Sequence, residues 1–430
     1  MTRFLLAVSA ILAAPSALAQ TPPHDMSTMP GMTETGDTSE HHGANLMSGT
    51  FGNYPMARDA SGTSWQPDAA GHAGVHLLMT DKWMVMGHAV FNGVYSSQGG
   101  PRGDDKAFAA GMAMVMARRG FDNGDSIDLH AMISPDPLMG KRGYPLLLAS
   151  GETADGTTHL IDRQHPHDFF MELSVSYTKS LSNSDSVFIY GGLPGEPAFG
   201  PPAFMHRPAA QESPEAPITH HWLDSTHITY GVATLGWVHG NFKVEASRFR
   251  GREPDQHRYD IETGDLDSTA VRVSWNPNPD WALQASWADV ISPEQLDPDV
   301  DQKRLSASAL FTHTYADGTE VSATLAFGRK ERTDGVNLDA WLSEASWKPD
   351  DKWTAFARGE AIESDELGLA HEINKVQKIS FGLIRDWRLN EHTKFGIGAL
   401  VARNFTDGAL DPLYGNDPWG GMAFVRLKIS

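Results

Sequence analysis

The residues of this chain that could do chemistry are mostly histidines and methionines, and they are unevenly placed. Sixteen of the 19 His and 16 of the 17 Met precede residue 260. Thioether sulfur is a soft ligand that favours Cu(I), and imidazole binds copper, zinc and other divalent ions. The 430-residue sequence contains no Cys, so a metal site would combine these residue types with Asp or Glu. Copper suits such a set, and three groups of residues are candidates to bind it.

The first group lies in residues 20–50, which are rich in Thr, Ser, Gly, Met and His and poor in large apolar residues. This composition predicts a disordered arm. The candidate metal ligands of the arm are His24, Met26, Met29, Met32, His41 and His42. The three methionines are spaced by three residues, and we interpret the arm as a copper-binding segment. The alternative is a low-complexity tail whose methionines bind nothing.

The second group lies on predicted strands. Met84, Met86 and His88 are spaced by two, so they share one face of a strand. The opposite face carries Trp, Val, Ala and Phe and suits lipid, which predicts that the first face points into the lumen of a barrel. The same reasoning predicts that His130 and Met132 point inward, where they could contact a metal ion.

A further series, Met112, Met114 and Met116, also shares one strand face. Both faces of this segment are apolar, so the sequence does not decide which of them points inward. Methionine is a flexible filler of irregular core space, and this role is the simpler interpretation of the series.

The third group lies within residues 159–257, which hold nine His. Its candidate metal ligands are His165, His167, Asp168, His206, His220, His221, Asp224 and His227. Imidazole with carboxylate suits Cu(II), Zn or another divalent ion. Five charged residues are expected to form a polar network in the lumen around them: Glu172, Glu196, Arg207, Glu245 and Arg252. The alternative is that all these groups form a purely structural network.

An enzymatic interpretation of the same region depends on Ser225 and His227. Two residues apart, they would share one face of a strand, with Asp224 or Glu172 as the orienting acid. Nothing else in the sequence marks Ser225 as an activated nucleophile. We therefore expect a protein that is not an enzyme and keep an outer-membrane hydrolase as the least favoured alternative.

The elements that must position these residues are strands. Val271 and Val273 alternate with Arg272 and Ser274, and this pattern recurs along the chain to a last strand at residues 420–429. On the strand after Asp168, Met171 is expected on the face opposite Glu172. Tryptophans at strand ends fit the aromatic girdle of a membrane barrel.

The connections between the strands follow the rule for outer-membrane barrels. Short turns alternate with longer acidic loops, as short periplasmic turns alternate with long external loops. The short turns are expected at residues 276–280, 316–319, 348–351 and 389–391. The sequence thus predicts an all-β fold, an antiparallel transmembrane β-barrel of about 16–18 strands. A soluble β-sandwich or β-helix is the rival fold.

The N-terminus predicts the compartment. Arg3, an apolar run at residues 4–14 and the small residues Ala17 to Ala19 are typical of a signal peptide covering residues 1–19. No later stretch approaches 18 uninterrupted apolar residues, so helical membrane spans are not expected. We expect an outer-membrane location in a Gram-negative bacterium, with the arm in the periplasm. The net charge of −20 argues against a nucleic-acid partner.

The predicted barrel covers residues 51–430 and contains one long connection. Residues 191–226 are rich in Pro and Gly, include Phe199 and Phe204, and carry no strand periodicity. A connection of this length is usually functional or disordered. Its small residues and buried-type aromatics predict that it folds into the barrel and constricts or plugs the lumen.

Four segments of the chain resemble a known family. They are residues 54–65 (with the sequences YPMAR and SGTSW), 163–168 (RQHPHD), 195–198 (GEPA) and 220–227 (HHWLDSTH). Together they resemble mostly uncharacterised proteobacterial outer-membrane proteins that are loosely associated with periplasmic copper-handling systems. The arm is similar to those of outer-membrane copper-resistance proteins. The resemblance implies an outer-membrane setting and a part in metal resistance.

The function we expect is therefore copper binding or export-related copper resistance. The arm would capture ions in the periplasm, and the lumen ligands would relay them. Outer-membrane lipid, the metal ion and periplasmic copper-handling proteins are the expected partners. The main alternative is a passive porin for small solutes, whose lumen charges set its selectivity.

Overall fold

The structure, a computed structural model, describes residues 46–71, 74–368 and 372–430. The predicted signal peptide and residues 20–45 of the predicted arm lie outside the described residues. The same holds for all the candidate ligands of the arm: His24, Met26, Met29, Met32, His41 and His42.

The described part of the chain consists mainly of strands. The first ten are β1 (Val75–Met79), β2 (Trp83–Gln98), β3 (Asp105–Gly120), β4 (Ser126–Ile133), β5 (Tyr144–Pro145), β6 (Arg163–Gln164), β7 (Phe170–Ser180), β8 (Asp185–Gly192), β9 (Val232–His239) and β10 (Phe242–Phe249). The others are β11 (Ser268–Asn278), β12 (Trp281–Val290), β13 (Gln302–Thr314), β14 (Glu320–Arg332), β15 (Asn337–Lys348), β16 (Trp353–Ser364), β17 (Asn374–Arg388), β18 (Thr393–Phe405) and β19 (Trp419–Ile429). The helical turns are α2 (His220–Leu223), α3 (Asp411–Tyr414) and the 3₁₀ turns Met56–Arg58, Asp68–Ala70, Asp136–Met139 and Ser225–His227. No helix among the described residues is long and apolar enough to cross a membrane.

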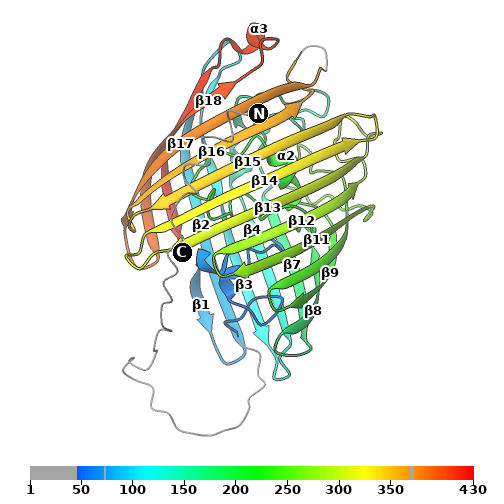
Figure 1. Cartoon of the computed structure of the whole chain (residues 1–430), viewed down its shortest axis with the longest axis vertical. Helices are drawn as coiled ribbons and strands as arrows, with labels where there is room; N and C mark the ends of the chain where they lie inside the picture. Colours follow the sequence, from blue (N-terminus) through cyan, green and yellow to red (C-terminus); the bar gives the residue numbers. More distant parts are fainter. Residues whose placement is uncertain (1–45, 72–73, 369–371) are drawn as a thin grey trace. The chain divides into compact units, whose positions relative to one another are not determined.

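Seventeen strands form one antiparallel sheet, and all of them except β1 close into a barrel of sixteen strands (Figure 1). The ring closes because β9 pairs with β10 and β19 pairs with β2. β1 pairs with the first residues of β2, and β19 pairs with the rest of that long strand. The prediction of an all-β antiparallel barrel of about 16–18 strands is therefore confirmed.

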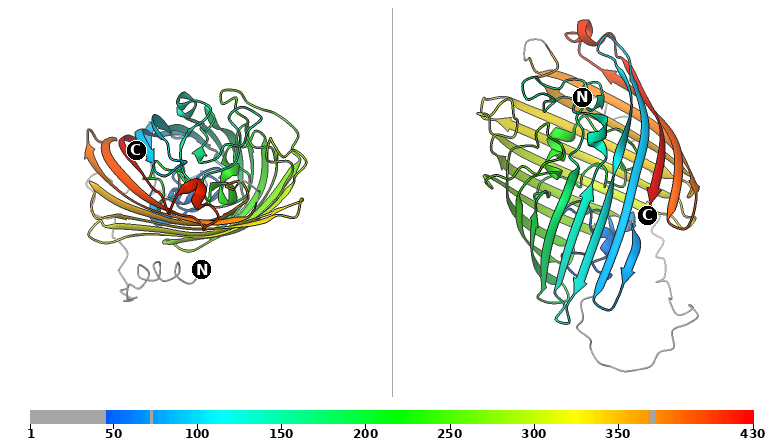
Figure 2. Two further views of the ribbon diagram at one scale, coloured as in Figure 1. Left: turned by 90° about the horizontal axis from the view of Figure 1, so that it is seen from above. Right: turned by 180° about the vertical axis from the view of Figure 1, so that it is seen from behind.

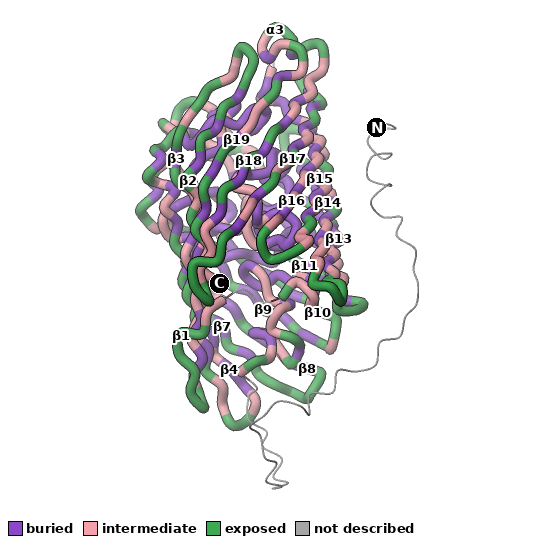
Figure 3. The backbone as a smooth tube through the Cα atoms, turned by 90° about the vertical axis from the view of Figure 1, so that its left-hand side faces the viewer, coloured by how far each residue is buried: buried purple, intermediate pink, exposed green. Residues whose placement is uncertain are grey.

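The two faces of the wall differ as the alternating pattern predicts. On β11, Arg272 and Ser274 are buried inside the barrel, whereas Val271 and Val273 are exposed on its outer face. Buried and exposed positions alternate in the same way along the neighbouring strands (Figure 3). An outer face of this kind suits lipid, because the polar residues and the backbone are turned away from it or paired.

The connections differ at the two ends of the barrel. At one end, which we call the short-turn end, the hairpins turn within a few residues, as between β9 and β10 or β11 and β12. Trp275, Trp347 and Trp387 are exposed close to these turns, as an aromatic girdle requires. At the other end, the long-loop end, most connections are longer, and the longest are 134–169 and 193–231.

Three segments fill the lumen: residues 46–71, 134–169 and 193–231 (Figure 2, left). They dock on inward-facing side chains of the wall and on one another. The Arg272 guanidinium donates a hydrogen bond to Thr63 Oγ1 at 2.9 Å, and Ser61 Oγ accepts one from the backbone N–H of Ala203 at 2.8 Å. Gly62 adopts a φ of +54° and lies against Glu196, where a Cβ would stand only 2.6 Å from the Glu196 Cβ. The backbone of the first segment therefore packs directly onto the third.

The structure corrects two details of the strand pattern. The register between β4 and β7 shifts after Met132, which pairs with Glu172, so that Met171 becomes an extra residue in β7. This bulge buries Met171 inside the barrel beside Glu172 instead of on the opposite face. In addition, Ser225 and His227 lie on a 3₁₀ turn and not on a strand, because the long connection extends to residue 231.

Candidate functional site

The inner faces of β2, β3 and β4 carry two rungs of side chains with soft or borderline donor atoms. Residues paired directly on adjacent strands have Cβ atoms about 4.5–5.5 Å apart. One rung is Met86, Met116 and His130, and the next, farther from the short-turn end, is His88, Met114 and Met132. The strand register thus places three sulfur or nitrogen donor atoms side by side in each of the two rungs. It also settles that Met114 and Met116 point inward, which the sequence left open.

A cavity of about 180 Å³ lies against these rungs. Seven methionines and five histidines line it: Met56, Met84, Met86, Met112, Met114, Met116, Met205, His88, His130, His165, His167 and His206. Near the short-turn end the lining includes Arg118 and Asp128, whose side chains form an ion pair at 3.6 Å. At its inner end the lining includes His165, His167 and Phe204. Met112 and Met114 also belong to a buried apolar cluster with Met132, Met171 and Ile228, so the methionines both pack against one another and line the cavity.

His206 reaches this cavity from the connection 193–231. Its ring centroid lies 6.1 Å from that of His88, with the two rings edge to face. The Nε2 atom of His206 is buried and has no hydrogen-bond partner among the described residues. Burial lowers the pKa of His206 to about 3, so the ring is neutral and can offer a nitrogen lone pair to a metal ion.

Five buried histidines gather at the inner end of the cavity, His165 and His167 from the connection 134–169 and the others from 193–231. The ring centroids of His167 and His227 lie 5.2 Å apart, and so do those of His220 and His227. His221 lies 5.4 Å from His220 and 5.6 Å from His165. We call these five residues the histidine cluster. The sequence identified all of them as candidate ligands, and the structure brings them together.

Three members of the cluster have their Nδ1 atoms held by oxygen atoms. His167 Nδ1 lies 2.8 Å from Asp136 Oδ2, and His220 Nδ1 lies 2.8 Å from Asp224 Oδ1. His227 Nδ1 donates to the backbone carbonyl oxygen of Asp224 at 2.6 Å. Burial lowers the pKa of His220, and it lowers the pKa of His227 well below its ordinary range, which keeps both rings neutral.

The other two members face acidic side chains. His165 Nε2 lies 3.2 Å from Glu152, and burial holds the pKa of His165 well below its ordinary range. His221 Nδ1 lies 3.6 Å from Glu253. Burial alone would lower the pKa of His221, but the hydrogen bond and the negative charge of Glu253 raise it. Asp168 lies 3.5 Å from Arg258, and burial raises the pKa of Asp168 to about 7.

The predicted polar network is present but divided. Arg207 binds both Asp224 and Glu344, and its guanidinium is fully buried. Glu245 pairs with Arg272 at 2.9 Å, and Glu196 lies 3.9 Å from the same guanidinium.

Two other predicted members of the network lie elsewhere. Glu172 accepts a hydrogen bond from Ser174 Oγ at 2.6 Å and lies 3.7 Å from His130 Nδ1, next to the methionine rungs. Arg252 donates to Ser292 at the long-loop end, apart from the other members.

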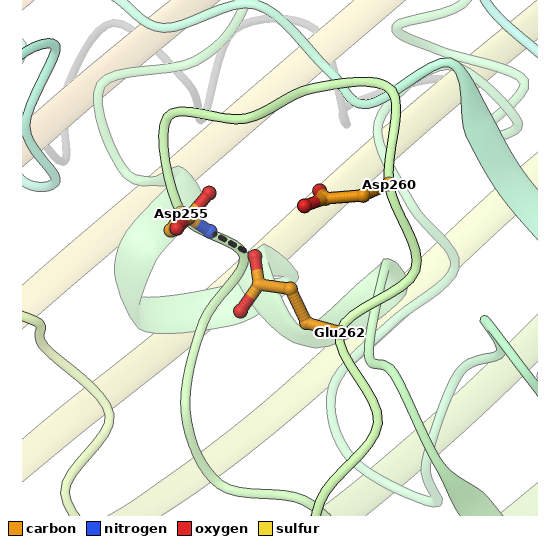
Figure 4. A group of neighbouring side chains, drawn as sticks. All are labelled: Asp255, Asp260 and Glu262. Carbon is orange, nitrogen blue, oxygen red and sulfur yellow. Dashed lines mark hydrogen bonds between the residues drawn. The ribbon is translucent and has the colours of Figure 1, made fainter.

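An acidic group in the connection 250–267 is the most compact set of three His, Asp or Glu side chains among the described residues. Asp255, Asp260 and Glu262 are its members, and their ligand atoms lie within 4.8 Å of one another (Figure 4). Glu262 accepts a hydrogen bond from the Asp255 backbone N–H and pairs with Arg250 at 3.4 Å. In the histidine cluster, no three ring nitrogens from different residues lie within 4.8 Å of one another, so its possible ligand atoms are farther apart than those of the acidic group.

The geometry around Ser225 does not favour nucleophilic catalysis. Ser225 Oγ donates to Glu253 at 3.1 Å and accepts from Arg304 at 3.0 Å. His227 Nδ1 is engaged by the Asp224 carbonyl group. The hydrolase alternative requires an imidazole within hydrogen-bond reach of the serine hydroxyl group, and Ser225 Oγ is instead bonded to a carboxylate and a guanidinium.

Several residues of the site escaped sequence reasoning. Asp136 follows a Ser-Pro pair in a long loop, and nothing in its local sequence marks it as the partner of His167. Glu152, Glu253 and Met205 likewise become visible only once the connections are folded. The Met112 series could have been assigned inward from its pairing with the strand that carries His88, had the register been known.

Comparison with known proteins supports the fold. No protein-family model matches the sequence, and no curated protein matches it. The structure is similar to OmpF of Salmonella typhi, solved in complex with daunomycin, with a TM-score of 0.50 and 9% identity over 82% of this chain and 99% of that one. This likeness shows the fold of an outer-membrane β-barrel.

Two further solved structures are similar at lower scores. An anion-selective porin from Comamonas acidovorans gives a TM-score of 0.47 and 11% identity, over 81% of this chain and 100% of that one. A loop-deletion mutant of OmpT, an outer membrane protein of Vibrio cholerae, gives 0.48 and 9% over the same shares.

Proposed function

We propose that this protein is an outer-membrane barrel that binds copper in its lumen and serves in copper handling or resistance. The observation that carries the proposal is the cavity of about 180 Å³, in which seven methionines and five histidines face one another. A packed core would close such a void, whereas a binding site needs it. Thioether and neutral imidazole together suit Cu(I) better than they suit hard cations such as Mg²⁺ or Ca²⁺.

The position of the cavity supports uptake from the periplasm. Met84 and the C-terminal residue Ser430 line the cavity near the short-turn end. In outer-membrane barrels the short turns face the periplasm. An ion held by the predicted arm, or delivered by a periplasmic copper-handling protein, would then meet the methionine rungs first.

The packing of the lumen weighs against a passive porin. Inward-facing charged side chains on β11, β13, β16 and β17, namely Arg272, Arg304, Glu360 and Lys378, are at most 1% exposed. The lumen side chains of an open pore contact water, whereas these are covered by the three segments that fill the lumen.

The test is Cu(I) binding by the purified mature chain in detergent micelles, measured against a chromophoric chelator under reducing conditions. All proteins carry Met26→Leu, Met29→Leu and Met32→Leu, so that the arm contributes no thioether. We expect a stoichiometric Cu(I) site.

The decisive comparison uses two variants of this protein. The triple change M86L/M114L/M116L removes thioethers from both rungs at nearly constant volume, which cores tolerate well. It should weaken Cu(I) binding at least about tenfold, since soft ligands select Cu(I). Met422→Leu is the matched control, because Met422 is a buried lumen methionine outside the cavity. Equal affinity of the triple variant and the control would contradict the proposal.

A further inference from the structure

The histidine cluster divides into two sets according to what its nitrogens contact. His165 and His221 are engaged by Glu152 and Glu253. These two carboxylates are themselves bound by guanidinium groups, Glu152 by Arg258 and Glu253 by Arg304. Both imidazoles therefore face carboxylates that are already paired, and the buried Nε2 atom of His165 has no hydrogen-bond partner among the described residues.

His167, His220 and His227 form the other set. Each has an oxygen atom on Nδ1, at 2.6 to 2.8 Å. A carbonyl oxygen can only accept, so the Nδ1 atom of His227 carries the proton and its Nε2 atom carries the lone pair. An oxygen on the far nitrogen is the arrangement that orients metal-bound histidines and raises their basicity.

Two of these three rings have a free end without a protein partner. The Nε2 atoms of His167 and His227 are buried, and neither has a hydrogen-bond partner among the described residues. A buried polar atom that is left without a hydrogen bond destabilises the folded state. The rings of His167 and His227 have their centroids 5.2 Å apart, so one ligand could contact the Nε2 atoms of both.

The surroundings of the three rings fit a bound cation. Asp136 is buried, and its carboxylate contacts the His167 imidazole and backbone N–H groups such as that of Gly111. No Lys or Arg of the described residues forms an ion pair with it. Phe204 packs against all three rings, at centroid distances of 5.6 to 6.4 Å, and supplies the apolar wall that shields a metal site from water.

We propose that His167, His220 and His227 form a second metal site, which binds one divalent ion of borderline softness, Cu(II) or Zn(II), through their Nε2 atoms. It rests on the proposed copper-handling function for its physiological role, but its ligand chemistry is separate from that of the methionine cavity. Three imidazoles and one open position are a common donor set for such ions. The ligand atoms are not yet mutually within 4.8 Å, so binding draws the rings together.

The test is Cu(II) binding by the full mature chain in detergent micelles. His24, His41 and His42 are replaced by Ala in every protein, so that the arm contributes no imidazole. After chelator treatment, Cu(II) is added at stoichiometric amount, and the EPR spectrum and the affinity against a competing chelator are measured. We expect one site with nitrogen hyperfine couplings, which added Zn(II) displaces.

His227→Gln should weaken Cu(II) binding at least about tenfold and reduce the nitrogen couplings, since it removes a ligand. The matched controls are His165→Gln and His221→Gln, which alter the same cluster but not the proposed ligands. Heat-modifiable migration on gels and trypsin resistance report whether each variant is folded. If His227→Gln does not fold, His167→Gln replaces it, because His167 belongs to the other connection.

Two results would overturn this second site: no nitrogen-coupled Cu(II) in the parent protein, or equal loss of Cu(II) in the two controls. The triple methionine variant separates this site from the proposed function. If the parent protein binds Cu(I) but does not bind Cu(II), only the proposal of the histidine site is contradicted. If the parent protein binds Cu(II) but does not bind Cu(I), only the proposal of the methionine site is contradicted.

Discussion

Asp136 links His167 to the wall of the barrel. Its Oδ2 atom lies 2.8 Å from His167 Nδ1, and its Oδ1 atom accepts a hydrogen bond from the backbone N–H of Gly111 in β3 at 3.2 Å. The aspartate stands on a 3₁₀ turn within the connection 134–169. An imidazole on a long loop is thereby fixed relative to a strand, which is what a preorganised ligand requires.

Replacement of Asp136 should therefore weaken the divalent site without removing a ligand. We expect Asp136→Asn to lower Cu(II) affinity about 10–100-fold, the usual effect of losing the carboxylate behind a metal-bound histidine. Competition with a chelator measures the change. Asp122→Asn, in the exposed turn between β3 and β4, is the control and should have no effect. An unchanged affinity in Asp136→Asn would mean that His167 is not a ligand.

The buried Arg207 should be important for the stability of the folded lumen. Arg207→Met leaves the carboxylates of Asp224 and Glu344 buried without their shared cation, and breaking such a group costs about 3–5 kcal/mol. Arg329→Met, which breaks an ion pair whose arginine is 43% exposed, should cost about 0–1 kcal/mol. Urea unfolding midpoints and the rate of trypsin cleavage within 193–231 measure both effects. Similar losses in the two variants would contradict the stabilising role of Arg207.

The connection 193–231 should act as a plug. Replacing residues 197–226 with a short Gly-Ser linker removes the segment that covers inward-facing charges such as Arg272 and Arg304. We expect single-channel conductance in planar bilayers to rise well above that of the complete protein. High conductance of the complete protein, unchanged in the linker variant, would instead favour the passive porin.

The stability of the lumen should depend on pH through Glu196. Burial raises the pKa of Glu196 to about 8, above its ordinary value of 4.5, so the folded state binds a proton more tightly than the unfolded state. The contribution of Glu196 to the free energy of unfolding is therefore complete below the pKa that it has in the unfolded chain. This contribution is lost as the pH rises through the higher pKa of Glu196 in the folded protein. Glu196→Gln should flatten the change in the urea midpoint between these two values. The exposed Glu391→Gln should behave like the parent protein, and a flat profile in the parent would exclude this effect.

Much of the fold could be predicted from the sequence because the barrel depends on a local pattern. The alternation of Val271 and Val273 with Arg272 is set by the two-residue repeat of a strand, and lipid outside with polar groups inside selects its direction. The same pattern placed Met84, Met86 and the rest of that strand face in the lumen. Long-range information was not needed for any of these assignments.

The site was harder to predict because it depends on how long loops fold. Asp136 and His167 are 31 residues apart, and no periodicity relates them. The bulge at Met171 breaks the alternation on which its orientation was predicted, because one extra residue shifts the register. Whether the candidate histidines bind metal stays a prediction.

The segments that fill the lumen have a consequence for the order of events in folding. The bond between Thr63 and Arg272 joins residues 209 positions apart, and that between Arg207 and Glu344 spans 137. Contacts of such sequence separation form late, because the entropy of closing long loops must be overcome first. The histidine cluster, which two of these lumen segments build, thus acquires its shape only as the barrel nears completion, whereas the methionine rungs lie on the consecutive strands β2, β3 and β4. A metal ion at the proposed histidine site would therefore bind after these connections have folded, and its binding would report that the lumen is assembled.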